Sequence, residues 1–156
     1  AQNQGAKKYH RALLGFLRGS AMVVGIGLIF SLLLFFGGNQ LVLPFLNGEA
    51  DSAALGASYL RLMGCFYFLS FMGHSYVGHY RGIGRMNITF WGTTLQIIVR
   101  VALTYALAGS MGLDAVALAT GLGWVAIVLF HSTVFLMELK GIGYHLPTQD
   151  EDTQSR

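Results

Sequence analysis

Charged residues are scarce in this sequence of 156 residues. Asp, Glu, Lys and Arg make up 11% of the chain, whereas soluble domains usually carry about 25%. Apolar residues make up 54%, and the mean hydropathy is +0.56. The net charge of +3 is small and scattered, which argues against nucleic acid as a partner. The composition therefore predicts an integral membrane protein whose surroundings are the lipid bilayer.

Proline and cysteine are nearly absent as well, with two Pro and one Cys against 21 Gly. The single thiol, Cys65, excludes a disulfide within the chain. Glycine lets helix backbones approach closely in membranes, and Gly15 with Gly19, or Ala117 with Gly121, has the four-residue spacing of such contacts. The apolar runs hold no Ser-His-Asp constellation, Cys/His cluster or carboxylate pair. We therefore expect no enzyme, no cofactor and no metal site.

Four apolar runs are long enough to cross a bilayer, since about 20 helical residues cover the hydrocarbon core. The predicted fold class is an all-α membrane protein with four transmembrane helices within residues 12–143. The predicted helices cover about residues 12–36, 52–80, 87–108 and 114–140.

Polar or glycine-rich segments separate these helices. Residues 37–40 (GGNQ) are expected to end the first helix, and the short apolar segment 41–46 to lie at the membrane interface. Asn87 is the candidate N-cap of the third helix, and residues 109–112 are expected to form a loop. The acidic residues 144–156 are expected to form a disordered cytoplasmic tail.

Basic residues occupy alternate connections along the chain. The polar segment 1–11, the turn 81–85 and the flank at Lys140 carry Lys or Arg, whereas segments 37–52 and 109–114 carry none. Cytoplasmic connections of membrane proteins are enriched in Lys and Arg. The alternation predicts a multi-pass protein of the plasma (inner) membrane with both termini cytoplasmic.

Two of the predicted helices carry polar side chains at helical spacing. Such a stripe normally faces protein or a water-filled path, because lipid cannot satisfy its hydrogen bonds. We therefore expect the hairpin of the second and third predicted helices, 52–80 and 87–108, to contact the substrate of the protein. The second helix presents Tyr67, Ser70 and His74 on one face, and the third presents Thr93, Gln96, Arg100 and Thr104. The candidates for a substrate cavity or proton relay are Arg100, His74, Gln96, Tyr67 and Thr93.

Arg100 lies about halfway along its helix, where an unpaired charge costs roughly 2.5–3.5 kcal/mol on insertion scales. It either lines a transport cavity or is a structural arginine bonded to helix-end carbonyls. His74 either relays a proton or is a neutral histidine bonded to a neighbouring helix. On the fourth helix, Trp124 is interpreted as a packed core residue and His131 as structural.

Four short segments resemble motifs of multidrug and toxic compound extrusion (MATE) transporters. Residues 2–9 (QNQGAKKY) resemble the family's Q-N-x-G-A-x-x-Y segment, and residues 59–61 (YLR) resemble its Y-L-R segment. Residues 80–84 (YRGIG) match its x-R-G-x-G turn, and residues 112–120 (GLDAVALAT) are similar to its G-x-x-G-A-A-x-A-T entry to the last helix. The segments occur in the family's order.

The resemblance implies a twelve-helix fold of two lobes. This chain would be a C-terminal fragment, the last four helices of the second lobe, and its partner would be the missing N-terminal part of the same transporter. The implied activity is secondary antiport that exports organic cations, drugs or toxic compounds in exchange for sodium ions or protons. The helix over 52–80 has no acidic residue beyond Asp51, so no coupling residue is assigned. The alternatives are a lipid-linked saccharide flippase of the same superfamily and a structural membrane subunit.

Overall fold

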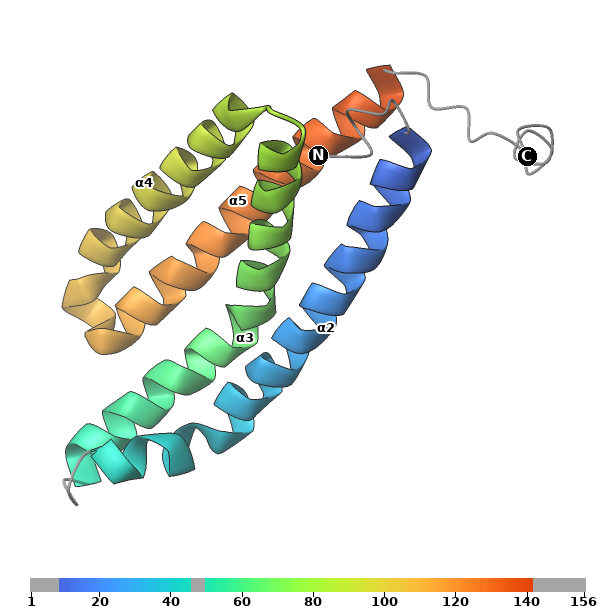
Figure 1. Cartoon of the computed structure of the whole chain (residues 1–156). Helices are drawn as coiled ribbons and strands as arrows, with labels where there is room; N and C mark the ends of the chain where they lie inside the picture. Colours follow the sequence, from blue (N-terminus) through green and yellow to red (C-terminus); the bar gives the residue numbers. More distant parts are fainter. Residues whose placement is uncertain (1–8, 46–49, 142–156) are drawn as a thin grey trace, which may run out of the picture.

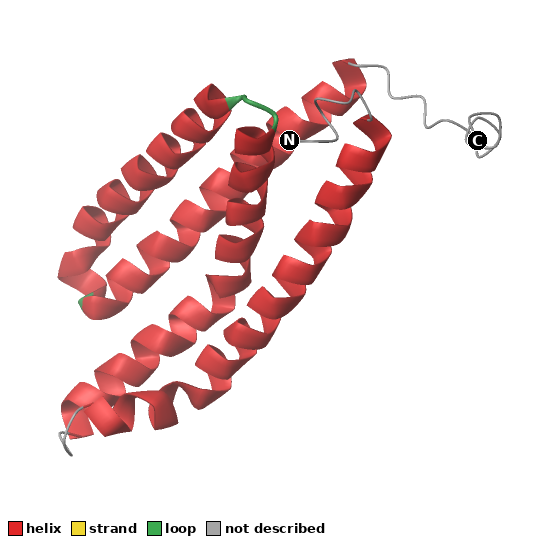
Figure 2. Cartoon of the chain, viewed as in Figure 1, coloured by secondary structure: helices red, strands yellow, loops and turns green. Residues whose placement is uncertain are grey.

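The computed structural model describes residues 9–45 and 50–141, and this part of the chain is helical and has no strand (Figures 1 and 2). All four of its long helices have the length and hydropathy to cross a membrane. The predicted all-α membrane fold with four spanning helices is thus confirmed. The elements are α2 (Tyr9–Val42), the short 3₁₀ helix η1 (Leu43–Phe45), α3 (Ala50–Gly82), α4 (Met86–Met111) and α5 (Leu113–Gly141).

The first helix does not end where the sequence suggests. α2 continues through residues 37–40 to Val42, so the expected break is wrong, and segment 41–45 is shared between α2 and η1. Glycine in a helix interior costs about 1 kcal/mol relative to alanine. Packing offsets this cost, because Gly38 is buried and a Cβ there would lie 3.3 Å from the Ala57 carbonyl oxygen of α3. Gly38 therefore serves helix contact, and neither glycine ends the helix.

The connections on both sides of α4 are shorter than expected. α4 runs to Met111, so the loop predicted over 109–112 is wrong except for Gly112, whose φ of +55° favours glycine and reverses the chain. The N-cap of α4 is Arg85 and not Asn87, which lies inside the helix. The predicted tail 144–156 lies outside the described residues.

α3 is the central helix of the bundle. It packs along α2 and against α5, whereas α4 packs mainly on α5 and barely meets α3 (Figure 1). The N-terminal half of α5 is deeply enclosed, and Ala115, Ala117 and Ala119 have no exposed surface. The outer surfaces of α2 and α4 present large apolar side chains such as Phe36 and Trp91, as helices in lipid or against further protein do.

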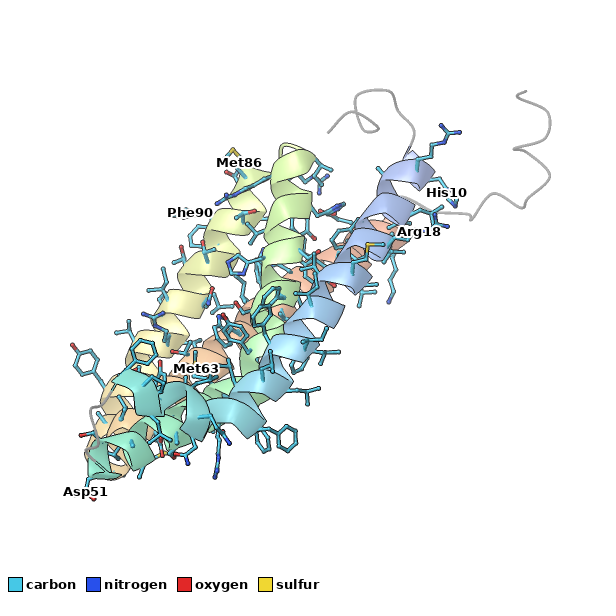
Figure 3. All side chains as sticks on the ribbon, turned by 60° about the horizontal axis from the view of Figure 1, so that its bottom comes forward. His10, Arg18, Asp51, Met63, Met86 and Phe90 are labelled. Carbon is cyan, nitrogen blue, oxygen red and sulfur yellow. The ribbon has the colours of Figure 1, made fainter. Side chains whose placement is uncertain are left out.

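The connections alternate between the two ends of the bundle. The start of α2, the α3–α4 turn and the end of α5 lie at one end, and the other two connections lie at the opposite end (Figure 1). Figure 3 likewise places His10, Arg18 and Met86 towards one end and Asp51 at the other. The segments that carry Lys or Arg in the sequence are therefore together in space, as far as the described residues extend.

The backbones of α2 and α3 approach closely at Gly64. A Cβ there would lie 2.8 Å from the Phe35 nitrogen and 2.9 Å from the Ser31 oxygen, both backbone atoms of α2. The Phe68 N–H donates to the Ser31 hydroxyl at 2.9 Å, although in a regular helix it would donate to the Gly64 carbonyl. A side chain that enters the hydrogen-bond ladder bends a helix, and α3 bends about halfway along its length (Figure 1).

Not every predicted small-residue contact occurs. Ala117 and Gly121 of α5 are buried, and a Cβ at Gly121 would lie 2.4 Å from the Phe66 ring. In contrast, a Cβ added at Gly15 or Gly19 of α2 would have no atom of the described chain within 4 Å. The four-residue spacing thus marks a real helix contact on α5 and an open surface on α2.

We expect Gly64→Ala to lower the free energy of unfolding by about 1–3 kcal/mol, because the added methyl would collide with backbone and not with a movable side chain. Gly78→Ala, on the same helix with open space at its Cβ, is the matched control and should leave stability unchanged or slightly raised. Thermal unfolding of the purified protein in detergent measures both. Equal effects of the two substitutions would contradict the close contact.

Candidate functional site

The polar stripe of α3 is only partly engaged by the bundle. Tyr67 is half-buried, and its ring meets Trp124 of α5 edge-on with centroids 5.7 Å apart. Trp124 is buried, in agreement with its interpretation as a core residue. His74 is exposed, and its Nδ1 lies 2.7 Å from the Ser70 carbonyl oxygen of its own helix. Among the described residues His74 makes no hydrogen bond to a neighbouring helix.

The polar stripe of α4 lies partly against α5. A Cβ at Gly123 would lie 3.2 Å from the Gln96 carbonyl oxygen and 3.5 Å from the Arg100 Cβ, so the two helices are close at this level. Thr93 is satisfied within its helix, because its hydroxyl donates to the carbonyls of Thr89 and Phe90 at 2.9 and 3.0 Å. Such back-bonding occupies the only donor of the hydroxyl and leaves its oxygen free to accept a hydrogen bond.

Arg100 differs from its neighbours on the stripe. Its side chain is exposed, and within residues 9–45 and 50–141 it makes no hydrogen bond or ion pair. No helix-end carbonyl among these residues binds its guanidinium, so the structural alternative finds no support in them. The charge remains available to a group that lies outside the described residues.

α5 brings three of the five candidates to neighbouring levels. Tyr67 of α3 meets α5 at Trp124, and Gln96 and Arg100 of α4 cover the adjacent residue, Gly123. His74 lies seven residues beyond Tyr67 on α3, and it makes no hydrogen bond with the other candidates. Tyr67, Gln96 and Arg100 therefore lie at neighbouring levels of α5. His74 of α3 and Thr93 of α4 lie apart from this group.

A buried aromatic and histidine cluster is a feature that sequence reasoning missed. His131 of α5 has no exposed surface, and its ring stacks against Tyr76 and Tyr80 of α3, with centroids 6.0 and 5.4 Å apart. Its Nδ1 lies 2.9 Å from the Ile127 carbonyl oxygen. The signal in the sequence is weak, namely two tyrosines four residues apart on α3, because nothing there shows which side of α5 meets them.

The cluster extends towards the end of the bundle where α4 begins. The Ser132 hydroxyl donates to the Tyr76 hydroxyl at 3.1 Å, and the His79 ring packs on Phe16 with centroids 4.3 Å apart. Beyond it, the Arg85 guanidinium pairs with the Glu138 carboxylate and ties the start of α4 to the end of α5. The part of the chain that the structure describes holds no group of three or more His, Cys, Asp or Glu suited to a metal ion.

Comparison with known proteins places the chain in a family. It matches the MatE family over residues 1–106, which includes three of the four motif segments, 2–9, 59–61 and 80–84. The fourth segment, 112–120, lies beyond the match. No curated protein and no solved structure matches the chain. Because the match covers more than half of the sequence, the chain belongs to the MatE family and is a multi-pass membrane protein of the MATE superfamily of transporters.

Proposed function

We propose that this chain is part of a secondary active antiporter that exports organic cations, drugs or toxic compounds in exchange for sodium ions or protons. The observation that carries the proposal is the MatE match over residues 1–106, together with four helices fit to span a membrane. The proposed setting is the plasma (inner) membrane, with both ends of the chain cytoplasmic.

The four helices would work beside the N-terminal part of the same transporter, as two-lobe folds do when they alternate access around a central site. The proposal assigns Arg100, Gln96 and Tyr67 to the wall of the substrate path, because they pack against the adjacent residues Gly123 and Trp124 of α5. Exposed His74 is a further position on that path, and Thr93, whose donor is used within its own helix, could offer substrate only an acceptor.

Arg100 would not bind a cationic substrate directly. A guanidinium in a membrane helix needs a counter-charge, and the described residues offer none to it. A carboxylate from the remainder of the transporter suits this role, because it could pair alternately with Arg100 and with a cation. Exchange of partners at one carboxylate is a simple way to couple substrate release to ion binding.

The same arginine favours a second candidate, the lipid-linked saccharide flippase. Phosphate binds guanidinium groups strongly through charge-assisted hydrogen bonds. One exposed arginine at mid-helix is compatible with such a headgroup, whereas a flippase cavity would be expected to gather several. The organic-cation antiporter therefore remains the first proposal.

Efflux of ethidium from cells that express the intact protein tests the proposal. We expect ethidium to leave these cells faster than vector-only cells, and efflux to collapse with either a protonophore or a sodium ionophore. The sensitive gradient identifies the coupling ion. Good membrane expression without ethidium export would contradict the antiporter, and lipid-linked saccharide would then be the next substrate tried.

We expect Arg100→Ala to lower efflux about tenfold, equivalent to about 1.4 kcal/mol, because its counter-charge would lose its partner. Arg18→Ala, at an exposed position near one end of the bundle, is the control and should retain efflux (Figure 3). Initial efflux rates are compared at equal amounts of protein in the membrane. Undiminished efflux by Arg100→Ala would remove this residue from the proposed path.

A further inference from the structure

α4 is held in the bundle mainly by its contact with α5. Of its described residues only Thr89 and Gly92 are buried, and they lie one helical turn apart on the side that meets α5. Gly92 lies directly over His131, because a Cβ at Gly92 would lie 2.4 Å from Cε1 and 2.9 Å from Nε2 of that ring. α4 therefore covers the His131 imidazole.

The His131 ring is held in one orientation. Its Nδ1 faces the Ile127 carbonyl, which only accepts hydrogen bonds, so in the neutral ring Nδ1 carries the proton and Nε2 has a free lone pair. The faces of Tyr76 and Tyr80 lie against the ring and prevent it from turning. Nε2 is thus directed at α4.

Two buried polar atoms at this contact have no partner in the described chain. They are Nε2 of His131 and the Thr89 hydroxyl oxygen, and they come from the two helices that face each other. Buried polar groups in proteins are almost always paired. The Thr89 hydroxyl could donate to the neutral Nε2, but the structure shows no such bond. A proton bound at Nε2 would turn this acceptor into a charged donor, and charge-assisted hydrogen bonds are stronger than neutral ones.

We propose that His131 is a proton-binding site whose protonation draws α4 onto α5 through Thr89. A proton from water adds to the Nε2 lone pair and leaves an imidazolium, and the new Nε2–H donates to the Thr89 hydroxyl oxygen. The positive charge then lies close to two tyrosine rings stacked with the imidazole, and aromatic faces attract cations. This inference rests on the proposed antiport and assigns a proton-binding group to it.

None of the charged or titratable side chains around the ring replaces His131 as the proton-binding group. The ionisable residues of α4, Arg100 and Tyr105, are exposed, and no α2 side chain within residues 9–45 makes a hydrogen bond, ion pair or ring contact with His131. On α5, Glu138 lies two turns further and is paired with Arg85. From α3, the ring is faced by Tyr76 and Tyr80, and His79 lies behind Tyr80.

Access to the proton site depends on α4. Because this helix packs extensively only on α5, its displacement would uncover Nε2 without disturbing the α2–α3 pair. Water would then reach the imidazole when α4 is displaced, and the charged ring would hold α4 in place once the proton is bound. Proton binding and the position of one helix are linked in this way.

Solid-state NMR of the intact protein in lipid bilayers, labelled with ¹⁵N at histidine, tests the inference without any transport substrate. His131→Asn identifies the His131 signals. We expect Nε2 to be unprotonated at about pH 8 and to become protonated as the pH is lowered to about 4. We expect Thr89→Val to weaken proton affinity about tenfold, since its hydroxyl accepts the new hydrogen bond, and Thr89→Ser to restore it.

Thr133→Val is the matched control, because the Thr133 hydroxyl is exposed and donates to the Leu129 carbonyl of its own helix. It should leave the His131 titration unchanged. An Nε2 that keeps one protonation state throughout this pH range would overturn the proposal. A Thr89→Val titration identical to that of the natural protein would also overturn it.

Efflux by the same variants separates this inference from the proposed function. Proton-dependent ethidium efflux that becomes insensitive to a protonophore in His131→Asn, with ethidium still bound, supports the coupling role. If the natural protein exports no organic cation, the proposed function fails, and the NMR titration still decides whether His131 binds a proton.

Discussion

The absence of water from the hydrocarbon core obliges each polar group on these helices to find a partner within protein. Most hydroxyls do so locally, as Thr120 does by donating to the Val116 carbonyl one turn before it. Others join two helices, as Ser20 of α2 does with Ser75 of α3. The polar atoms that do neither are few in the described part of the chain, and they include the Arg100 guanidinium on the outside and Nε2 of His131 on the inside.

This pairing is possible because glycine, which has no side chain, allows neighbouring helices to approach closely. At Gly64 the backbone of α3 lies so close to α2 that the Ser31 hydroxyl reaches the Phe68 N–H, and α3 bends there. At Gly92 the missing side chain leaves room for the His131 ring between α4 and α5. Glycine thus determines where α3 bends and where the His131 ring is buried. In both places a polar side chain is enclosed because a neighbouring backbone comes close to it.

The number and class of the helices could be predicted from the sequence, because hydropathy and length alone determine whether a segment can span a membrane. The glycine positions could not be interpreted in the same way. Glycine is common both at helix ends and at helix contacts, and in this chain Gly38 lies at a helix contact whereas Gly112 lies at a helix end. The orientation of α5 was also beyond prediction, since its apolar residues surround the helix and give no buried face, so His131 was not recognised as central.

α4 carries one of these exceptional groups and covers the other. Arg100 projects from it without a partner among the described residues, and Thr89 and Gly92 of the same helix cover the free nitrogen of His131. A movement of α4 relative to α5 would change the surroundings of both groups at once, because Gly123 under Arg100 and His131 under Gly92 lie on one rigid helix two turns apart. A counter-charge that binds Arg100 and a proton that binds His131 would then act on the same displacement. For a transporter of this superfamily, that is the physical condition for linking the movement of one solute to that of another.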